Sequence, residues 1–277
     1  MDTQLITIYC LCHDLLQALD HNEDHQRKMS DAEVMTTALA AARLFKGNFA
    51  TARLFLKQQG YIPKMLSKST FSERLHRLVE PFFLLFQVLS QTYKAQEGAG
   101  LYLIDSFPVA VCDNIRINRC RLYDLEATQG AFRGYTPSKR RYFYGVKIHI
   151  LVTKDGLPVE VFLTPGACSD TAELKNFAFD LPEGSTVYGD KAYNEYFTED
   201  LLQEACSITL LPLRKKNSKR PVAAFVEYVQ RYYRKGVETA GSMIERLLPK
   251  SIHATSAAGF ELKVFLFVLA HSLSGVL

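Results

Sequence analysis

Apolar positions recur at helical spacing through the first third of the chain. The pattern predicts helices over residues 5–19, 30–45 and 49–59, and another that begins near residue 70 and continues past Phe82. Ser30-Asp-Ala-Glu33 and Thr70-Phe-Ser-Glu73 both have the spacing of a capping box, in which a hydroxyl and a carboxylate satisfy early backbone N–H groups. Gly-Ala-Gly at residues 98–100 marks a boundary, so residues 1–97 are expected to form a helical domain.

After that boundary the pattern changes to strands. Residues 101–109 form an apolar run with the length of a buried strand. We expect this strand to end at Asp105, because Pro108 cannot donate to a ladder of hydrogen bonds. Further strands are expected as a hairpin over 146–164, and singly over 186–189 and 208–213.

Helices alternate with these strands and are expected over residues 170–179, 196–206 and 223–248. The resulting order of elements is that of the ribonuclease H-like fold, an α/β architecture whose sheet mixes antiparallel and parallel strands. In that arrangement the first and fourth strands are neighbours, and the late helix crosses their ends. Residues 98–277 are therefore expected to form one ribonuclease H-like domain with flanking helices.

Three carboxylates stand on these elements. Asp105 and Asp190 each follow an apolar strand, and Glu238 lies on the long C-terminal helix. Singly, each has a plain explanation, since an aspartate after a strand is usually a turn residue and Glu238 can pair with Arg234 one turn away. The expected fold lets the three converge, and carboxylate oxygens are ligands of hard divalent cations. The sequence therefore predicts a metal site.

Composition and charge limit the partners of such a site. The chain has 277 residues, of which 48% are hydrophobic, as in a globular protein with a sizeable core. Its net charge of +4 is modest, so an anionic partner would be bound by local basic patches. One such patch is the irregular segment 112–142, where basic and aromatic residues interleave and suit a phosphate backbone with unpaired bases. The alternative is a loop whose charges serve solubility.

A second basic stretch, residues 67–77, has the features of the second helix of a helix-turn-helix. It would place four side chains against DNA: Lys68, Arg74, His76 and Arg77. An ordinary helical bundle with a solvated basic face explains the same pattern, and both interpretations stay open.

The remaining residue types and segments point to no further site. The six cysteines fit neither a zinc pattern nor a disulfide framework, and we expect reduced, mostly buried thiols in a cytosolic protein. His149, alone on a strand, is expected to be a hydrogen-bonded structural residue. The N-terminus lacks a secretory signal, and we find no run of roughly 18 apolar residues for a membrane span. The apolar tail, residues 262–277, is expected to be a buried helix.

Several stretches, in this order, resemble those of DDE transposases from bacterial insertion sequences. The resemblance covers most of the chain from residue 101 onward, and the helical first third has the size of an end-binding domain. The similar stretches are Leu103-Ile-Asp-Ser-Phe-Pro108, Gly145-Val-Lys-Ile-His149, residues 163–170, Gly189-Asp-Lys-Ala-Tyr193, Tyr233-Arg-Lys-Gly-Val-Glu-Thr239, Ile252-His-Ala254 and Gly259-Phe-Glu-Leu-Lys263.

The resemblance implies the catalytic residues and their cofactor. The two family aspartates fall on Asp105 and Asp190, and the family glutamate on Glu238, with Glu245 as the alternative third ligand. These acids would hold two Mg²⁺ or Mn²⁺ ions per active site. The implied chemistry is cleavage of DNA at the element's ends, followed by attack of the freed 3′-hydroxyls on target DNA.

The resemblance also implies partners. These are the element's terminal inverted repeats and target DNA, bound by a homodimer in a synaptic complex in the nucleoid-associated bacterial cytoplasm, with no membrane. The candidate DNA contacts are Lys147, Arg234, Lys235, Lys191, Arg140 and Arg141. Two other interpretations remain: a stand-alone metal-dependent nuclease of the same fold, and a catalytically silent DNA-binding protein derived from a transposase.

Overall fold

The computed structural model describes residues 1–113, 116–117, 120, 122–123, 130–136, 140–214, 216–249 and 251–277. These residues fall into two compact units. A helical unit combines Met1–Leu89 with Ile244–Leu277, and a unit built on a β-sheet comprises Ser90–Met243. The C-terminal segment therefore packs with the N-terminal helices. The functional division expected between residues 97 and 98 remains a prediction.

The helical unit is built from α1 (Asp2–Ala18), α2 (Asp31–Leu44), α3 (Phe49–Gln58), α4 (Lys68–Arg77), the first half of α5 (Val79–Glu97), the end of α8 (Ala224–Leu247), and α9 (Ala257–Ser272). The capping box at Ser30 and Glu33 is confirmed. The one expected at Thr70 is wrong, because Ser67 caps α4 and accepts a hydrogen bond from the Thr70 N–H at 3.3 Å. The single helix expected from near residue 70 past Phe82 is instead two helices, α4 and α5. Pro81 has no N–H group to donate to the carbonyl of Arg77, so it interrupts the helix; it is tolerated in the first turn of α5, where this bond is not needed.

Helix α9 is a largely buried helix of the helical unit. It packs against α2, and the Arg43 guanidinium donates to the Ala270 carbonyl at 2.9 Å. By length and composition alone, Ala257–Gly275 could cross a membrane, contrary to the expectation that no such segment exists. However, 67% of the segment is buried among protein side chains. Its apolar residues serve the core, as expected for the tail of the chain.

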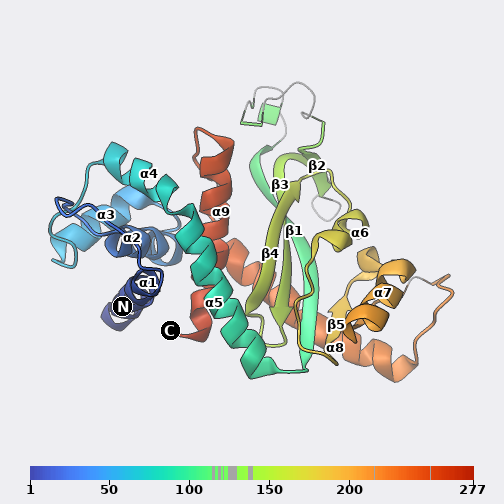
Figure 1. Cartoon of the computed structure of the whole chain (residues 1–277). Helices are drawn as coiled ribbons and strands as arrows, with labels where there is room; N and C mark the ends of the chain where they lie inside the picture. The colour runs from blue at the N-terminus through green and yellow to red at the C-terminus, as the bar shows by residue number, and fades with distance from the viewer. Residues whose placement is uncertain are drawn as a thin grey trace. The chain divides into compact units, whose positions relative to one another are not determined.

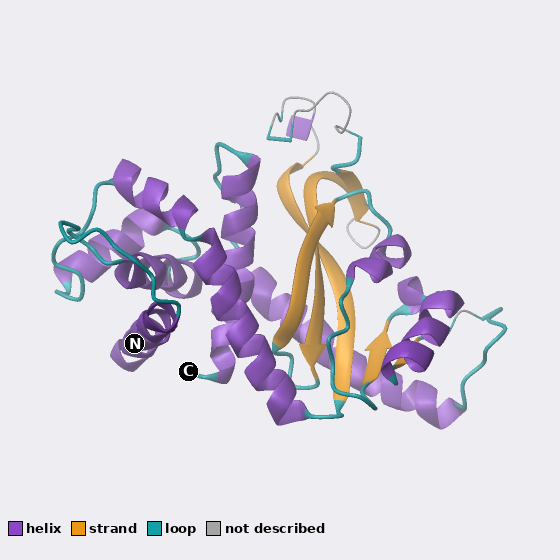
Figure 2. Cartoon of the chain, viewed as in Figure 1, coloured by secondary structure: helices purple, strands orange, loops and turns teal. Residues whose placement is uncertain are grey.

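The sheet unit contains six strands: β1 (Leu101–Asp113), β2 (Arg133–Thr136), β3 (Arg141–Thr153), β4 (Pro158–Pro165), β5 (Thr186–Gly189) and β6 (Thr209–Pro212). Their order is β2-β3-β1-β5-β6, and β4 pairs with β3 (Figures 1 and 2). The pairs β1–β3 and β3–β4 are antiparallel, whereas β1–β5 and β5–β6 are parallel. This mixed sheet confirms the predicted ribonuclease H-like fold, including the adjacency of the first and fourth predicted strands.

Strand β1 is longer than predicted. It continues through Pro108, which is paired with Lys147, as far as Asp113. The expectation that Pro108 ends the pairing is wrong. Strand β5 pairs only with Leu101–Leu103, so among the described residues the rest of β1 has a strand neighbour on one edge. A proline is tolerated at such an open edge, because no ladder hydrogen bond is lost there.

Part of the basic and aromatic segment expected to be irregular is also strand. Strand β2 pairs with the start of β3, where Tyr135 lies 5.0 Å from Tyr142 between ring centroids. The Arg133 guanidinium lies 4.8 Å from the Tyr142 ring centroid. Cross-strand aromatic and cation–π contacts of this kind stabilise a β-ladder. Arg119, Arg121 and Lys139 lie outside the described residues.

The helices around the sheet are α6 (Asp170–Glu173) with the 3-10 turn η3 (Leu174–Asn176), the 3-10 turn η4 (Lys191–Tyr193), α7 (Tyr196–Cys206) and α8. The helix predicted over 170–179 is therefore much shorter than expected. The Glu160 carboxylate accepts hydrogen bonds from the N–H groups of Ala178 and Asp180, each at 3.0 Å. These bonds replace the helical ones and draw the chain out of the helix.

The six cysteines are reduced thiols, as expected. Only Cys12 is buried, so the expectation that most are buried is wrong. Cys10 and Cys206 are exposed, and burial raises the pKa of the Cys12 thiol to about 12.

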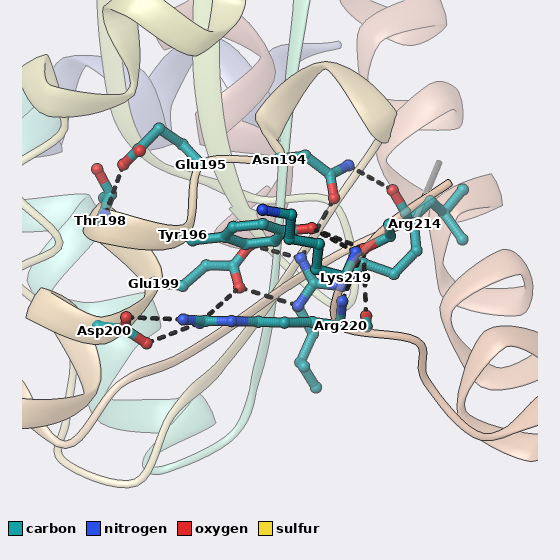
Figure 3. A network of polar contacts seen from close by, with 12 residues as sticks. Asn194, Glu195, Tyr196, Thr198, Glu199, Asp200, Arg214, Lys219 and Arg220 are labelled. Atoms are coloured by element: carbon teal, nitrogen blue, oxygen red, sulfur yellow. Dashed lines mark hydrogen bonds and ion pairs between the residues drawn. The ribbon is translucent and has the colours of Figure 1, made fainter. Parts of the chain in front are cut away.

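The basic run between β6 and α8 is anchored at both ends on α7. Arg214 donates two hydrogen bonds to the buried carboxylate of Glu199, at 2.5 and 2.9 Å. Arg220 donates two to Asp200, at 2.7 and 2.8 Å, and lies 4.7 Å from the centroid of the Tyr196 ring. Figure 3 shows the Arg220 side chain flat against that ring. The two arginines thus fix the loop, and Lys216 and Lys219 between them are exposed.

His149, for which the sequence predicts a structural role, lies in the core of the sheet. It is fully buried, accepts or donates a hydrogen bond of 2.9 Å between Nε2 and the Thr164 hydroxyl, and stacks on Phe162 with ring centroids 4.8 Å apart. Burial lowers its pKa to about 4; the Asp170 charge opposes this shift and Lys147 adds to it. The imidazole is therefore neutral in the folded protein at pH 7, and its structural role is confirmed.

We predict that the two carboxylates of the α7 anchor differ sharply in their contribution to stability. The Glu199 side chain is 6% exposed and that of Asp200 is 54% exposed. Glu199→Gln leaves the Arg214 charge buried without its counter-ion, so the free energy of unfolding should fall by about 3 kcal/mol. Asp200→Asn should lower it by less than about 1 kcal/mol, because a solvated pair contributes little. Urea unfolding of both variants tests this, and equal losses would contradict it.

We predict that His149 makes the folded protein less stable in acid. In the unfolded chain a histidine titrates near pH 6.5, whereas folding lowers the pKa of His149 to about 4. Between these values only the unfolded state binds the proton. Stability is therefore complete above about pH 6.5 and falls as the pH drops toward 4, by on the order of 3 kcal/mol. In His149→Gln this part of the pH dependence should vanish, and in the exposed control His25→Gln it should persist. Parallel curves for wild type and His149→Gln would refute the assignment.

Candidate active site

The parallel pairing of β1 with β5 places the first two predicted carboxylates side by side. Leu103 of β1 is paired with Tyr188 of β5. Two residues further along each strand, Asp105 and Asp190 therefore reach the same level of the sheet and point to the same face. Both side chains are half-buried. The structure thus brings this predicted pair together at the point where β5 ends.

Backbone N–H groups orient both carboxylates. Oδ1 of Asp105 accepts a hydrogen bond from the Ser106 N–H at 2.8 Å. Asp190 caps η4, and its Oδ1 accepts from the Ala192 N–H at 2.6 Å. Each hydrogen bond restricts the orientation of the carboxylate that accepts it, and a carboxylate can accept from more than one partner at once.

Helix α8 crosses the same face of the sheet. Gln230 donates to the Leu211 carbonyl on β6 at 2.9 Å, and the Tyr233 ring lies 6.2 Å from that of Tyr188 on β5. Further along the helix, a Cβ atom on Gly241 would lie 3.5 Å from Phe107 of β1. Phe107 is two residues after Asp105 and so shares its face. In the view of Figure 1, α8 accordingly passes behind the strands.

These contacts place Glu238 on the turn of α8 between β5 and β1. It precedes Gly241 by three residues, about 4.5 Å along the helix axis, and its side chain is exposed. Among the residues that the structure describes, no group of three Asp, Glu, His or Cys side chains lies close enough to hold a metal ion. The structure therefore joins Asp105 and Asp190 closely and brings Glu238 to their face on an adjacent element. Half-buried carboxylates on one face of a sheet fit the ligand chemistry of Mg²⁺ or Mn²⁺.

A fourth carboxylate, which the sequence analysis missed, lies on the opposite face. Asp170 at the start of α6 accepts hydrogen bonds from the Ser106 hydroxyl at 2.7 Å and from the Lys147 ammonium at 3.1 Å. Lys147 also donates to the Cys168 carbonyl at 2.7 Å. This lysine, a candidate phosphate contact, is thus held by Asp170 on the face opposite Asp105. The resemblance that includes residues 163–170 was the only signal for it.

Tyr193 is a second residue that the sequence analysis did not single out. It is 1% exposed, and its hydroxyl makes no hydrogen bond within the described parts of the chain. Burial raises its pKa well above the ordinary value, and the charges of Asp170 and Asp105 raise it further; Ser106 opposes the shift, and Asp190 adds least to it. The phenol therefore lies within electrostatic reach of all three carboxylates.

Gly189 leaves the space that this arrangement needs. A Cβ atom there would lie 2.8 Å from Cγ2 of Ile104 and 3.2 Å from Cδ2 of Tyr193. Distances this short require neighbouring atoms to move, so glycine is the residue that fits beside Asp190.

The other predicted contacts lie at the surface. Lys191 on η4, Lys235 on α8, and Arg140 and Arg141 at the start of β3 are all exposed. The side chain of Arg234 lies outside the described residues. Glu245, the alternative third ligand, is exposed two turns after Glu238, on the part of α8 that belongs to the helical unit.

Comparison with known proteins agrees with this geometry. The family of the transposase DDE domain matches residues 95–249, more than half of the chain. The match includes β1, β5 and all of α8, and so covers Asp105, Asp190 and Glu238. No curated protein and no solved structure matches the chain. The family match shows that the chain belongs to the transposases with a DDE domain.

Proposed function

We propose that this transposase serves an insertion sequence, cutting phosphodiester bonds at the element's ends and joining the 3′-hydroxyls to target DNA. The observation that best supports this is the register of β1 and β5, which sets Asp105 beside Asp190 on the face that α8 crosses. Glu238 is our third catalytic residue, because its turn of α8 immediately precedes the contact with Phe107.

We propose two Mg²⁺ or Mn²⁺ ions per site as the cofactors. Asp105, Asp190 and Glu238 are the residues that would hold them. When bound, such a pair lowers the pKa of the attacking water or hydroxyl and neutralises the leaving oxygen. The protein holds Asp105 and Asp190 in place through backbone N–H groups, so these ligands need little reorganisation.

The exposed cations near this face are the proposed contacts to DNA phosphates. Lys191 follows Asp190 directly, and Lys235 lies one turn before Glu238. Arg140, Arg141 and Arg234 are further candidates. Lys147 would have to exchange its Asp170 partner for a phosphate, so we assign it first to positioning Asp170.

The assembly follows from the reaction. Both ends of an element must be cut and joined together, so the proposed working form is a homodimer that holds two terminal repeats and the target DNA. Residues 1–97 are the proposed end-binding domain and residues 98–277 the catalytic domain, acting at the bacterial nucleoid.

One observation favours a second candidate, a catalytically silent DNA-binding protein. Within the described parts of the chain, no three acidic or imidazole side chains are close enough to hold a metal ion. Glu238 would have to turn toward Asp105 when cations and DNA bind. A protein in which that movement does not occur would bind DNA without cutting it.

We predict metal-dependent nicking of a labelled duplex that carries the native element end. Asp105→Asn, Asp190→Asn and Glu238→Gln should each reduce the rate by at least about 100-fold, equivalent to about 3 kcal/mol of lost transition-state stabilisation. Glu245→Gln, a matched change on the same helix, should leave the rate within about threefold of the wild type.

The other outcomes separate the alternatives. If nicking is lost in Glu245→Gln and retained in Glu238→Gln, the third ligand is Glu245 and not Glu238. Unchanged nicking in both aspartate variants would overturn the metal site. Binding of the duplex by the wild type without cleavage under any metal condition would establish the silent protein.

A further inference from the structure

The helical unit contains a pocket of about 490 Å³ that no part of the proposed chemistry uses. Helices α3 and α4 form one side of it, and the segment leading into α9 forms the other. Its charged and titratable lining residues are Arg53, Lys68, His76, His253 and Lys263. Phe49 and Phe71 provide aromatic walls. A volume of this size accommodates a ligand as large as a nucleotide unit.

The charge of the pocket is one-sided. No Asp or Glu side chain is among the described residues that line it. Nor do Arg53, Lys68 or Lys263 form an ion pair with any carboxylate in the described parts of the chain. Elsewhere in this unit, Arg27, Arg74 and Arg77 each pair with a carboxylate. In the pocket the cations lie over aromatic rings instead, Lys263 at 5.3 Å from the centroid of Phe49 and Arg53 at 5.6 Å from that of Phe71.

The cations of this pocket repel one another. Burial lowers the pKa of Lys263, and the charge of Lys68 lowers it further. The Lys263 ammonium donates to the His253 carbonyl, and the Arg53 guanidinium donates to the Leu66 carbonyl. Nε of Arg53 is buried without a partner among the described residues. Cations that repel one another and an N–H group without an acceptor favour an anion as the ligand of this pocket.

The start of α9 adds to the positive potential. Ser256 caps this helix of 16 residues and lines the pocket with Gly259. A helix N-terminus carries a partial positive charge and exposed N–H groups, which favour phosphate. The pocket thus combines two lysines, an arginine and a helix N-terminus. This set suits a phosphate group better than a carboxylate, because a phosphate has more acceptor oxygens and can carry more charge.

We propose that this pocket binds a phosphate group of the DNA backbone, an inference that rests on the proposed action of the chain on element ends. Of the four residues expected to face DNA on α4, Arg74 is bound to Asp31 and the Met29 carbonyl, and Arg77 to Glu73 at 2.5 Å. Lys68 and His76 instead line the pocket. The phosphate contact is thus shared between α4 and the C-terminal segment. This phosphate contact does not depend on a helix-turn-helix motif. In such a motif a short turn joins the two helices, whereas here nine residues, 59–67, separate α3 from α4.

The test measures binding of the native end duplex by fluorescence anisotropy in EDTA, so that cleavage plays no part. Lys68→Gln and Lys263→Gln should each weaken binding about tenfold near 0.1 M salt. Each should also make the slope of log K against log salt shallower by about one. Lys57→Gln, an exposed lysine on α3 outside the pocket, is the matched control and should change neither quantity. Thermal melting of all three variants checks that they are folded.

A second arm identifies the source of the phosphate. Thermal melting with inorganic phosphate or deoxyadenosine monophosphate should show stabilisation at millimolar concentrations that Lys263→Gln removes. If these small ligands bind but both pocket variants bind duplex like the Lys57 variant, DNA is the wrong ligand. If both pocket variants behave like Lys57→Gln in every arm, there is no phosphate site. If the wild type binds the duplex through the pocket but never cuts it, the proposed function is wrong and the phosphate site still stands.

Discussion

The parallel register between β1 and β5 is the constraint on which the site depends. Each strand contributes one aspartate, and a slip of one residue would turn one of them to the opposite face. Gly189 allows the two strands to pair without a steric clash, since any side chain at that position would collide with Ile104 and Tyr193. The chemistry thus rests on a backbone pairing whose own residues are mostly apolar.

Electrostatics set the second requirement. Three aspartates approach one buried phenol, and their charges raise the pKa of Tyr193 beyond the effect of burial. Lys147 neutralises Asp170 on one face, while Asp105 and Asp190 on the other are stabilised by backbone N–H groups. Two half-buried carboxylates on one face of the sheet favour a divalent cation as their partner.

Periodicity and element order predict much of this fold. They give the sheet, the long α8 helix, and the placement of Asp105 and Asp190, because these features follow from local patterns and from the few ways such elements pack. What they miss is decided by tertiary contacts. Pro108 lies within a strand because the neighbouring edge of β1 is open, and α6 is short because the Glu160 carboxylate takes its backbone partners.

The site itself is predictable only in part. Asp105 and Asp190 each follow an apolar run and can be found from it, and Glu238 follows from the resemblance. Asp170 and Tyr193 lie in stretches that carry the resemblance, but the local pattern does not single them out, because Asp170 opens a helix and Tyr193 ends a short turn. Charge patterns were similarly ambiguous. Arg74 and Lys68 look alike along α4, but Arg74 pairs with Asp31, whereas Lys68 lines the basic pocket.

The most direct test of the account is the location of a bound cation. Crystals of the protein grown with Mn²⁺, with or without an end duplex, can be measured for anomalous scattering. We expect a peak about 2.1 Å from carboxylate oxygens of both Asp105 and Asp190, with Glu238 turned toward it when DNA is present. A peak held by Asp170 on the opposite face, or no peak at Asp105 at saturating Mn²⁺, would contradict the central claim.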